Sequence, residues 1–294
     1  MDRRKLTRLL AALAAAALVL LGGIELYRRQ GTPVPVLKYH HFMDVDSSDV
    51  DTIVTVKRFR EQLLALKAAG YTPVDPFEIA DHVENGTPLP DKPVLITMDD
   101  GYSSNLELAA PVLEECGMKA TVFVIGATVG RTTYPGSETV LDPPRFSWEQ
   151  VRPWVEKGIL CVQSHTYEMH HRSGGEWDRD GVLQKPGEGE RDYRAALTAD
   201  VERAKSELED GLDVPLIAVA FPYGLWSRTA VQQFRQAGIK LTFTTHYGCS
   251  RVRQGKAGSM QVLDRWWIGD DITGAQLVEG LEKIERRAVC RGGF

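Results

Sequence analysis

The chain has 294 residues, of which 43% are hydrophobic and 26% are charged, and these values are typical of a globular protein. They exclude collagen-like, low-complexity and wholly disordered chains. The formal net charge of −5 lacks the basic excess that binding to nucleic-acid phosphates requires, so we expect no nucleic-acid partner. The four cysteines form no CxxC pair, which excludes a zinc ribbon.

The N-terminal segment, residues 1–30, differs from the rest of the chain. Basic residues at positions 3, 4, 5 and 8 precede a run of 16 uncharged residues, 9–24. Such a run is intermediate between the apolar part of a signal peptide and the roughly 20 residues of a membrane-spanning helix. No small-residue cleavage site follows, which favours an uncleaved membrane anchor; secretion after signal cleavage is the alternative. The basic residues predict a short cytoplasmic tail, with the domain at 31–294 outside the cytoplasm.

Residues 31–294 alternate apolar runs with amphipathic stretches, which predicts a single α/β domain built around a parallel sheet. Because the apolar runs are short and continuous, we expect strands that are buried on both faces. The predicted strands are Val36–Tyr39, Val94–Met98, Thr121–Ile125, Ile159–Gln163, Leu216–Phe221 and Lys240–Thr244.

Helical spacing of apolar residues predicts helices around 59–66, 197–208 and 277–288, the last with Thr273 as its N-cap. Ser147 and Gln150 predict a capping box in front of a helix that Pro153 limits. Residues 173–192 are polar and rich in glycine, which predicts a long excursion near a functional face.

Two aspartates follow the strand predicted at 94–98. Asp99 and Asp100 stand at its carboxyl end, where α/β folds place their ligands. Adjacent strand residues point to opposite faces, so we expect different roles for the two carboxylates, one as a metal ligand and one as a proton acceptor. For this motif alone, a simple Asp-Asp-Gly turn is the alternative.

Three histidines follow the strand predicted at 159–163, namely His165, His170 and His171. A spacing of five separates His165 from His170 around a helix, so both reach one ion only if the chain curls as a loop. Two imidazoles and a carboxylate hold a metal ion and leave positions open for water and substrate. His171 is expected to be a bystander, and solvated surface histidines are the alternative for the whole group.

Two further clusters stand at predicted strand ends. Residues 220–224 (AFPYG) contain a turn around Pro222 and Tyr223 that is suited to aim a backbone N–H into a site. His40 follows the first predicted strand and supplies an imidazole suited to general acid catalysis.

Taken in order and spacing, the motifs at 97–102 (TMDDGY), 164–166 (SHT) and 221–224 (FPYG) resemble the polysaccharide deacetylases of carbohydrate esterase family 4. The resemblance implies a distorted (β/α) barrel, usually of seven strands, and metal-dependent removal of acetyl groups from N-acetylated sugars. It implies that Asp99 is the catalytic base and that Tyr223 offers its backbone N–H to the oxyanion. The metal ligands that it implies are Asp100, His165 and His170.

The chain departs from the family pattern in three places. The histidines are five residues apart instead of four, Ala220 replaces an arginine that orients the base, and Arg265 stands where a late Leu-x-His motif supplies the acid. These departures resemble the exported poly-N-acetylglucosamine deacetylase branch, in which an early histidine replaces that acid. We therefore expect His40 to be the acid, with His246 as the alternative.

The expected substrate is an extracellular polysaccharide with N-acetylglucosamine units, bound by Tyr223, Pro222 and Trp226. Zinc is the metal that the ligand types favour, and cobalt, nickel and iron also fit. Two other functions stay open: a catalytically inactive sugar-binding protein on the same scaffold, and a different two-histidine-one-carboxylate metalloenzyme such as a non-haem iron oxygenase.

Overall fold

The computed structural model describes residues 31–46, 50–174 and 178–288, together with residues 10, 13, 15–17, 22 and 23. Most of the apolar run predicted as a membrane anchor, residues 9–24, lies outside the described residues. Within the described part of the chain, no helix is both long and apolar enough to cross a membrane. The predicted membrane anchor therefore has no structural support and stays a prediction.

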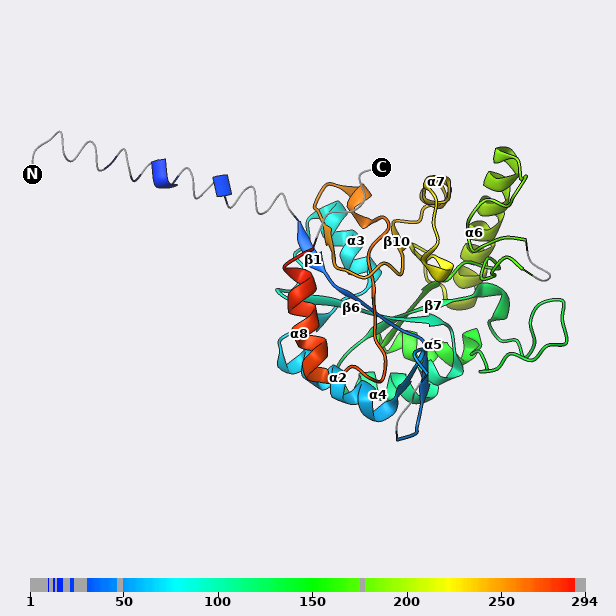
Figure 1. The fold of residues 1–294 in the computed structure, drawn as a ribbon, viewed down its shortest axis with the longest axis horizontal. Coiled ribbons are helices and arrows are strands. Elements are labelled where there is room, and N and C mark those ends of the chain that lie inside the picture. Colours follow the sequence, from blue (N-terminus) through cyan, green and yellow to red (C-terminus); the bar gives the residue numbers. More distant parts are fainter. Residues whose placement is uncertain are drawn as a thin grey trace, which may run out of the picture.

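One curved parallel sheet organises the domain (Figure 1). Among the described residues seven of its strands follow one another in the order β10-β9-β8-β7-β6-β2-β12, and β5 pairs separately with β6. These strands are β2 (Val36–Tyr39), β5 (Thr72–Pro73), β6 (Pro93–Asp100), β7 (Ala120–Val124), β8 (Leu160–Ser164), β9 (Ala218–Ala220), β10 (Leu241–Phe243) and β12 (Trp266–Trp267). The sheet curls into a distorted (β/α) barrel of seven strands, which confirms the expected fold.

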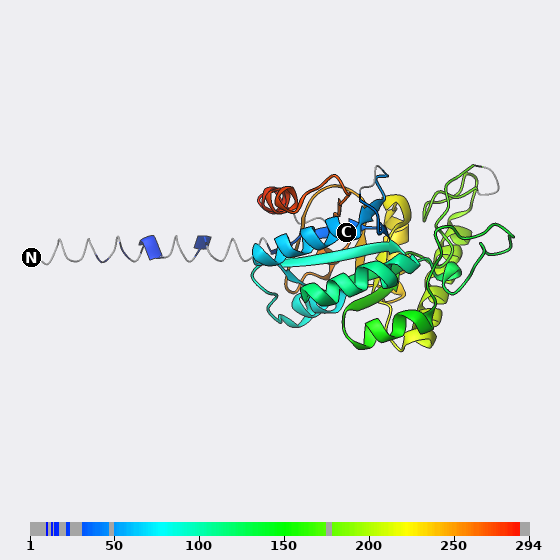
Figure 2. The ribbon, with the colours of Figure 1, turned by 90° about the horizontal axis from the view of Figure 1, so that it is seen from below.

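Two smaller pairs of strands lie beside this sheet. The antiparallel pair joins β1 (Thr32–Val34) to β11 (Ser250–Val252), and the parallel pair joins β3 (His41–Met43) to β4 (Ile53–Thr55). The α-helices of the domain are α2 (Val56–Ala68), α3 (Pro76–Asn85), α4 (Ala110–Cys116), α5 (Trp148–Glu156), α6 (Glu190–Leu212), α7 (Arg228–Gln236) and α8 (Gly274–Glu285). Helices α8, α2 and α4 lie side by side along the outside of the sheet, and α5, α6 and α7 continue this layer (Figures 1 and 2).

Strand side chains alternate between two hydrophobic clusters, as the period of a strand requires. Leu95 belongs to the inner cluster, whereas Ile96 belongs to the outer cluster between the sheet and the helices. Helix α3 contributes Ile79 and Val83 to the inner cluster. Every residue of β6 is buried, so this strand carries its terminal aspartates into the interior.

All six strands predicted from the sequence are present, within three residues at each end. The capping box at Ser147 and the N-cap at Thr273 are confirmed. The expected limit at Pro153 is wrong, because helix α5 continues to Glu156. A proline removes one backbone N–H donor, but its carbonyl still accepts, and the N–H of Lys157 donates to the carbonyl of Pro153 at 3.2 Å.

A substitution in helix α8 tests how tightly this helix covers β12. A methyl group added at Gly280 would overlap the ring of Trp266, which precedes the exposed Trp267 in the chain. We expect Gly280→Ala to lower the free energy of unfolding by about 1–3 kcal/mol in a urea titration, because overpacking forces the ring or the helix to move. The exposed Glu279→Ala in the same helix should change it by less than about 0.5 kcal/mol. Equal stabilities of the two variants would contradict this packing.

Candidate active site

The candidate site lies at the carboxyl ends of three strands of the main sheet, β6, β8 and β9. Asp100 closes β6, His165 follows β8, and a turn at Pro222–Gly224 follows β9. One residue at each strand end has a left-handed backbone: φ is 74° at Asp100, 71° at Thr166 and 58° at Tyr223. Non-glycine residues seldom adopt this conformation, and such strain gathers at functional sites.

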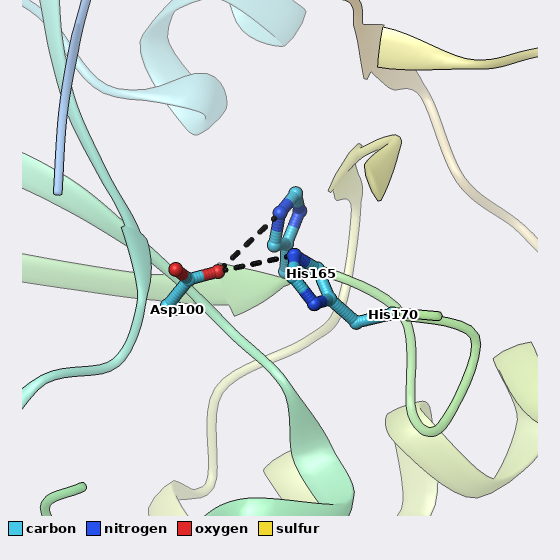
Figure 3. A group of neighbouring side chains, drawn as sticks. All are labelled: Asp100, His165 and His170. Atoms are coloured by element: carbon cyan, nitrogen blue, oxygen red, sulfur yellow. Dashed lines mark ion pairs between the residues drawn. The ribbon is translucent and has the colours of Figure 1, made fainter. Parts of the chain in front are cut away.

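Asp100, His165 and His170 form a group that fits a metal ion. Their ligand atoms all lie within 4.8 Å of one another. Asp100 Oδ1 is 3.6 Å from Nε2 of His165 and 3.4 Å from Nε2 of His170 (Figure 3). This carboxylate oxygen is buried and accepts no hydrogen bond, although buried polar atoms normally have partners. A cation between the oxygen and the two imidazoles would satisfy it.

Both imidazoles are held with a nitrogen lone pair available to a metal. His165 Nδ1 donates to the carbonyl of Ala220 at 2.7 Å, which leaves Nε2 unprotonated in the neutral ring. The His170 ring stacks on Tyr223, whose hydroxyl is 3.3 Å from His170 Nδ1. Burial lowers the pKa of both histidines, that of His170 to about 4, so both stay neutral at neutral pH. Neutral imidazole is the form that binds metals.

Asp99 and Asp100 both face this site, and the expectation that they point to opposite faces is wrong. Asp99 follows the strand alternation and points inside the barrel, where its Oδ2 is 3.9 Å from His165 Nε2. Asp100 would point away, but its left-handed backbone turns the carboxylate back towards the histidines. The separate roles of the two carboxylates stay a prediction.

Arg265 is the main residue of the site that the sequence analysis missed. Its Nη1 and Nη2 donate to the two oxygens of Asp99 at 2.7 and 2.8 Å, and both side chains are buried. Burial alone would raise the pKa of Asp99, but the charge and hydrogen bonds of Arg265 outweigh burial and lower it. Two departures from the family pattern together could have indicated this pair: Ala220 stands where the family has an arginine that orients the base, and an arginine stands at 265 instead.

His40 also lies beside Asp99. Its Nε2 is 4.0 Å from Asp99 Oδ2, its Nδ1 is buried without a hydrogen-bond partner, and its ring lies on Trp267 with centroids 5.1 Å apart. Lys38, two residues earlier on β2, places Nζ 4.0 Å from the centroid of the same indole. Burial lowers the pKa of this ammonium to about 8. Trp267 is 41% exposed.

The structure does not bring every predicted residue to this place. Tyr223 is 38% exposed beside His170, and Pro222 is buried in the same turn. Trp226 packs against the outer hydrophobic cluster instead. His246 is 58% exposed, with Nδ1 3.2 Å from Asp264 Oδ1. The residues that gather around the triad are His40, Asp99, Arg265 and Tyr223, and all catalytic and binding roles stay predictions.

Asp200, on helix α6, fixes the loop between the two histidines. Its carboxylate accepts the backbone N–H groups of Tyr167 at 2.9 Å and Glu168 at 2.8 Å. Burial raises the pKa of Asp200 to about 6. The expected curl of the chain after His165 is therefore present, and a carboxylate more than thirty residues away in the sequence holds it.

Replacing Arg265 tests the buried pair. We expect Arg265→Gln to lower the free energy of unfolding by about 3–5 kcal/mol, because the Asp99 carboxylate would stay buried without its partner. The double variant Arg265→Gln with Asp99→Asn removes both charges and should recover a large part of this loss. A denaturant titration at neutral pH measures both values. Similar stabilities of the wild type and Arg265→Gln would show that the pair does not act in this way.

Adjacent histidines give a matched test of the metal triad. We expect His170→Ala to abolish stoichiometric Zn²⁺ or Co²⁺ binding to the metal-free protein, because the triad loses one of three ligands. His171→Ala alters the neighbouring residue and should keep the wild-type affinity. Isothermal titration calorimetry measures the affinity, and the absorption spectrum of bound Co²⁺ reports the ligands. Equal affinity of the two variants would place the metal elsewhere.

Comparisons with known proteins agree with this geometry. The sequence profile of the polysaccharide deacetylase family matches residues 86–242, more than half of the chain. The poly-beta-1,6-N-acetyl-D-glucosamine N-deacetylase of Escherichia coli K12 is 25% identical over 234 residues, covering 74% of this chain and 34% of that protein. This chain therefore matches only about a third of the length of that relative.

Two other similar proteins match over most of their length. The putative polysaccharide deacetylase YxkH of Bacillus subtilis is 25% identical over 252 residues, covering 86% of this chain and 77% of that protein. The structure of IcaB from Ammonifex degensii superposes with a TM-score of 0.67 at 29% identity, covering 85% of this chain and 97% of that one. Family profile, fold and site agree, and the chain belongs to the polysaccharide deacetylase family.

Proposed function

We propose that the protein removes acetyl groups by hydrolysis from a polysaccharide with N-acetylglucosamine units, and that the reaction depends on a divalent metal ion. The observation that carries this proposal is the group Asp100, His165 and His170 beside the Asp99–Arg265 pair. The names of relatives support the substrate class, since those from Escherichia coli and Staphylococcus epidermidis are poly-beta-1,6-N-acetyl-D-glucosamine N-deacetylases.

The triad fits a metal ion by donor type, spacing and the unsatisfied oxygen of Asp100. The chemistry that a divalent ion supplies at such a site is Lewis acidity, which acidifies a water molecule and polarises the acetyl carbonyl. Zinc is the proposed ion, and cobalt, nickel or iron suit the same ligands.

Asp99 is the proposed general base, because its Oδ2 faces the triad and lies 3.9 Å from His165 Nε2. Arg265 donates to both carboxylate oxygens, which fixes the orientation of Asp99 and keeps it ionised, ready to accept a proton from the attacking water. The same pairing weakens Asp99 as a base, so proton transfer relies on the acidity of that water.

His40 is the proposed general acid for the departing sugar amine. Its Nε2 is 4.0 Å from Asp99 Oδ2, so acid and base lie on the same side of the triad. His246 has a carboxylate partner in Asp264 but is 58% exposed, which favours His40. The backbone N–H of Tyr223 is proposed to stabilise the oxyanion of the tetrahedral intermediate, and the left-handed turn presents this residue beside His170.

Exposed aromatic rings on two sides of the site suit a sugar chain. Trp267 stacks on His40 and Tyr223 stacks on His170, and both rings are partly exposed. Flat apolar faces bind pyranose rings, so we propose that sugar rings of the substrate pack on these two residues. Trp267 takes the place that the sequence analysis gave to Trp226.

We also propose, from the sequence of residues 1–30 alone, that the domain acts outside the cytoplasm, either anchored in the membrane or secreted. The basic start and the apolar run 9–24 support this proposal.

Acetate release from N-acetylglucosamine oligomers tests the proposal. We expect the metal-free protein to be inactive and to regain activity with Zn²⁺, Co²⁺ or Ni²⁺. Asp99→Asn should lower kcat at least about a hundredfold, and His40→Ala should lower it by a similar factor, as loss of a general base or acid does. His246→Ala is the matched control for His40 and should stay within about twofold of the wild type.

The outcomes separate the alternatives. Sugar binding without acetate release under any metal would support an inactive sugar-binding protein. Turnover that consumes oxygen and requires iron would support an oxygenase. A large loss of activity in His246→Ala, with little loss in His40→Ala, would show that His246 is the general acid. The proposed deacetylase activity would still hold.

A further inference from the structure

Two arginines stack on the two tyrosines that flank the metal triad. The Arg145 guanidinium lies 3.8 Å from the ring centroid of Tyr102, and that of Arg172 lies 5.3 Å from the ring centroid of Tyr223. The Tyr223 hydroxyl is 3.3 Å from His170 Nδ1, and Tyr102 follows Asp100 by two residues at the end of β6. The two arginines therefore stand on the rim of the site, one tyrosine away from the metal ligands.

The two arginines differ in how their charge is compensated. Arg172 Nε lies 3.4 Å from Asp180 Oδ1. Arg145 forms no ion pair with any carboxylate of the described residues; its Nη1 donates to the carbonyl of Pro143 at 2.5 Å, and its Nε is buried without a partner. Arg145 is half-buried, so its positive charge is only partly solvated. An anion therefore binds to such a guanidinium with a more favourable free energy than to a fully solvated one.

The backbone holds Arg145 in place beside the strand end that carries Asp100. Arg145 and Tyr102 form an antiparallel bridge, and the next residue, Phe146, donates its N–H to the carbonyl of Gly101 at 3.2 Å. A ligand at the triad and a group bound to Arg145 can thus belong to one glycan chain.

We propose that Arg145 selects a glycan with a negatively charged group, a carboxylate or a phosphodiester, close to the acetamido sugar that is hydrolysed. This inference deepens the proposed function and rests on it. The planar guanidinium presents paired donors that match carboxylate and phosphate oxygens, and stacking on Tyr102 holds the plane in position before the ligand arrives. An uncharged homopolymer of N-acetylglucosamine leaves this cation without a partner.

Matched substrates test the selection. The first is a neutral N-acetylglucosamine oligomer, and the second is a peptide-free glycan of equal length in which alternate sugars carry an ether-linked carboxylate. The third is the same glycan with its carboxylates converted to amides, and the fourth is an oligomer that carries a phosphodiester. We expect the wild type to show a kcat/KM about tenfold higher for a charged glycan than for its neutral counterpart, the effect of one partly exposed charge-assisted hydrogen bond. The second and fourth substrates distinguish a carboxylate from a phosphodiester.

Variants assign the preference to Arg145. In Arg145→Gln the ratio of kcat/KM for charged to neutral glycan should fall to about one, and Arg145→Lys should keep part of it, because the charge remains while the paired donors are lost. Arg172→Gln is the matched control and should keep the wild-type ratio, since Asp180 already compensates Arg172. High salt should reduce the ratio in the wild type and leave it unchanged in Arg145→Gln.

Equal kcat/KM values of the wild type for charged and neutral glycans would overturn the inference and leave the deacetylase proposal intact. An unchanged ratio in Arg145→Gln would do the same. Absence of acetate from all four glycans would instead refute the proposed function. In that event the affinity of the metal-free wild type and Arg145→Gln for the charged and amidated glycans, measured by calorimetry, still decides whether Arg145 binds the anion.

Discussion

The buried ion pair between Arg265 and Asp99 is the interaction on which the site depends. Transfer of two charges from water into a protein costs several kcal/mol per ion, and only close paired hydrogen bonds offset this cost. The guanidinium meets that requirement with its two bonds to Asp99, and its Nε donates to the carbonyl of Thr244 at 2.8 Å. Asp99 belongs to β6 and Thr244 follows β10, and three other strands lie between β6 and β10 in the sheet. The Arg265 side chain therefore orients the proposed base and also links two strands that are not neighbours.

The left-handed backbone at the strand ends positions the other residues of the site. Left-handed residues cost of order 1–3 kcal/mol each and persist only where neighbours hold them. Thr166 is held by its own hydroxyl, which accepts the N–H of Met169 at 3.2 Å, and by the clamp of Asp200 on the following residues. Tyr223 is held by Thr245, whose hydroxyl donates to its carbonyl at 3.2 Å. Hydrogen bonds from neighbouring residues thus offset the cost of the left-handed backbone at the strand ends.

The sequence predicted those parts of the molecule that depend on neighbours in the chain. Continuous apolar runs located the six strands, and the motifs that follow two of them located the triad. Arg265 was missed because its partner is 166 positions away, and β12 was missed because a strand of two residues has no periodicity. The direction of Asp100 was predicted wrongly for a related reason: strand alternation applies until the backbone leaves the β region, and the residue letters do not reveal a left-handed φ.

Lys38 is a further buried charge that must be balanced, as the charges of Arg265 and Asp99 are. Lys38 and Arg265 stand against Asp99 and Asp100, and burial keeps the two imidazoles of the triad neutral. The four charged groups therefore balance before any ion binds. A divalent cation at the triad would leave the interior positive, and in surroundings of low polarity this excess would favour negative charge on a ligand over a neutral form. Lys38 has its ammonium on the Trp267 indole, without a hydrogen bond or ion pair to a carboxylate of the described residues, so it acts on this balance through its field.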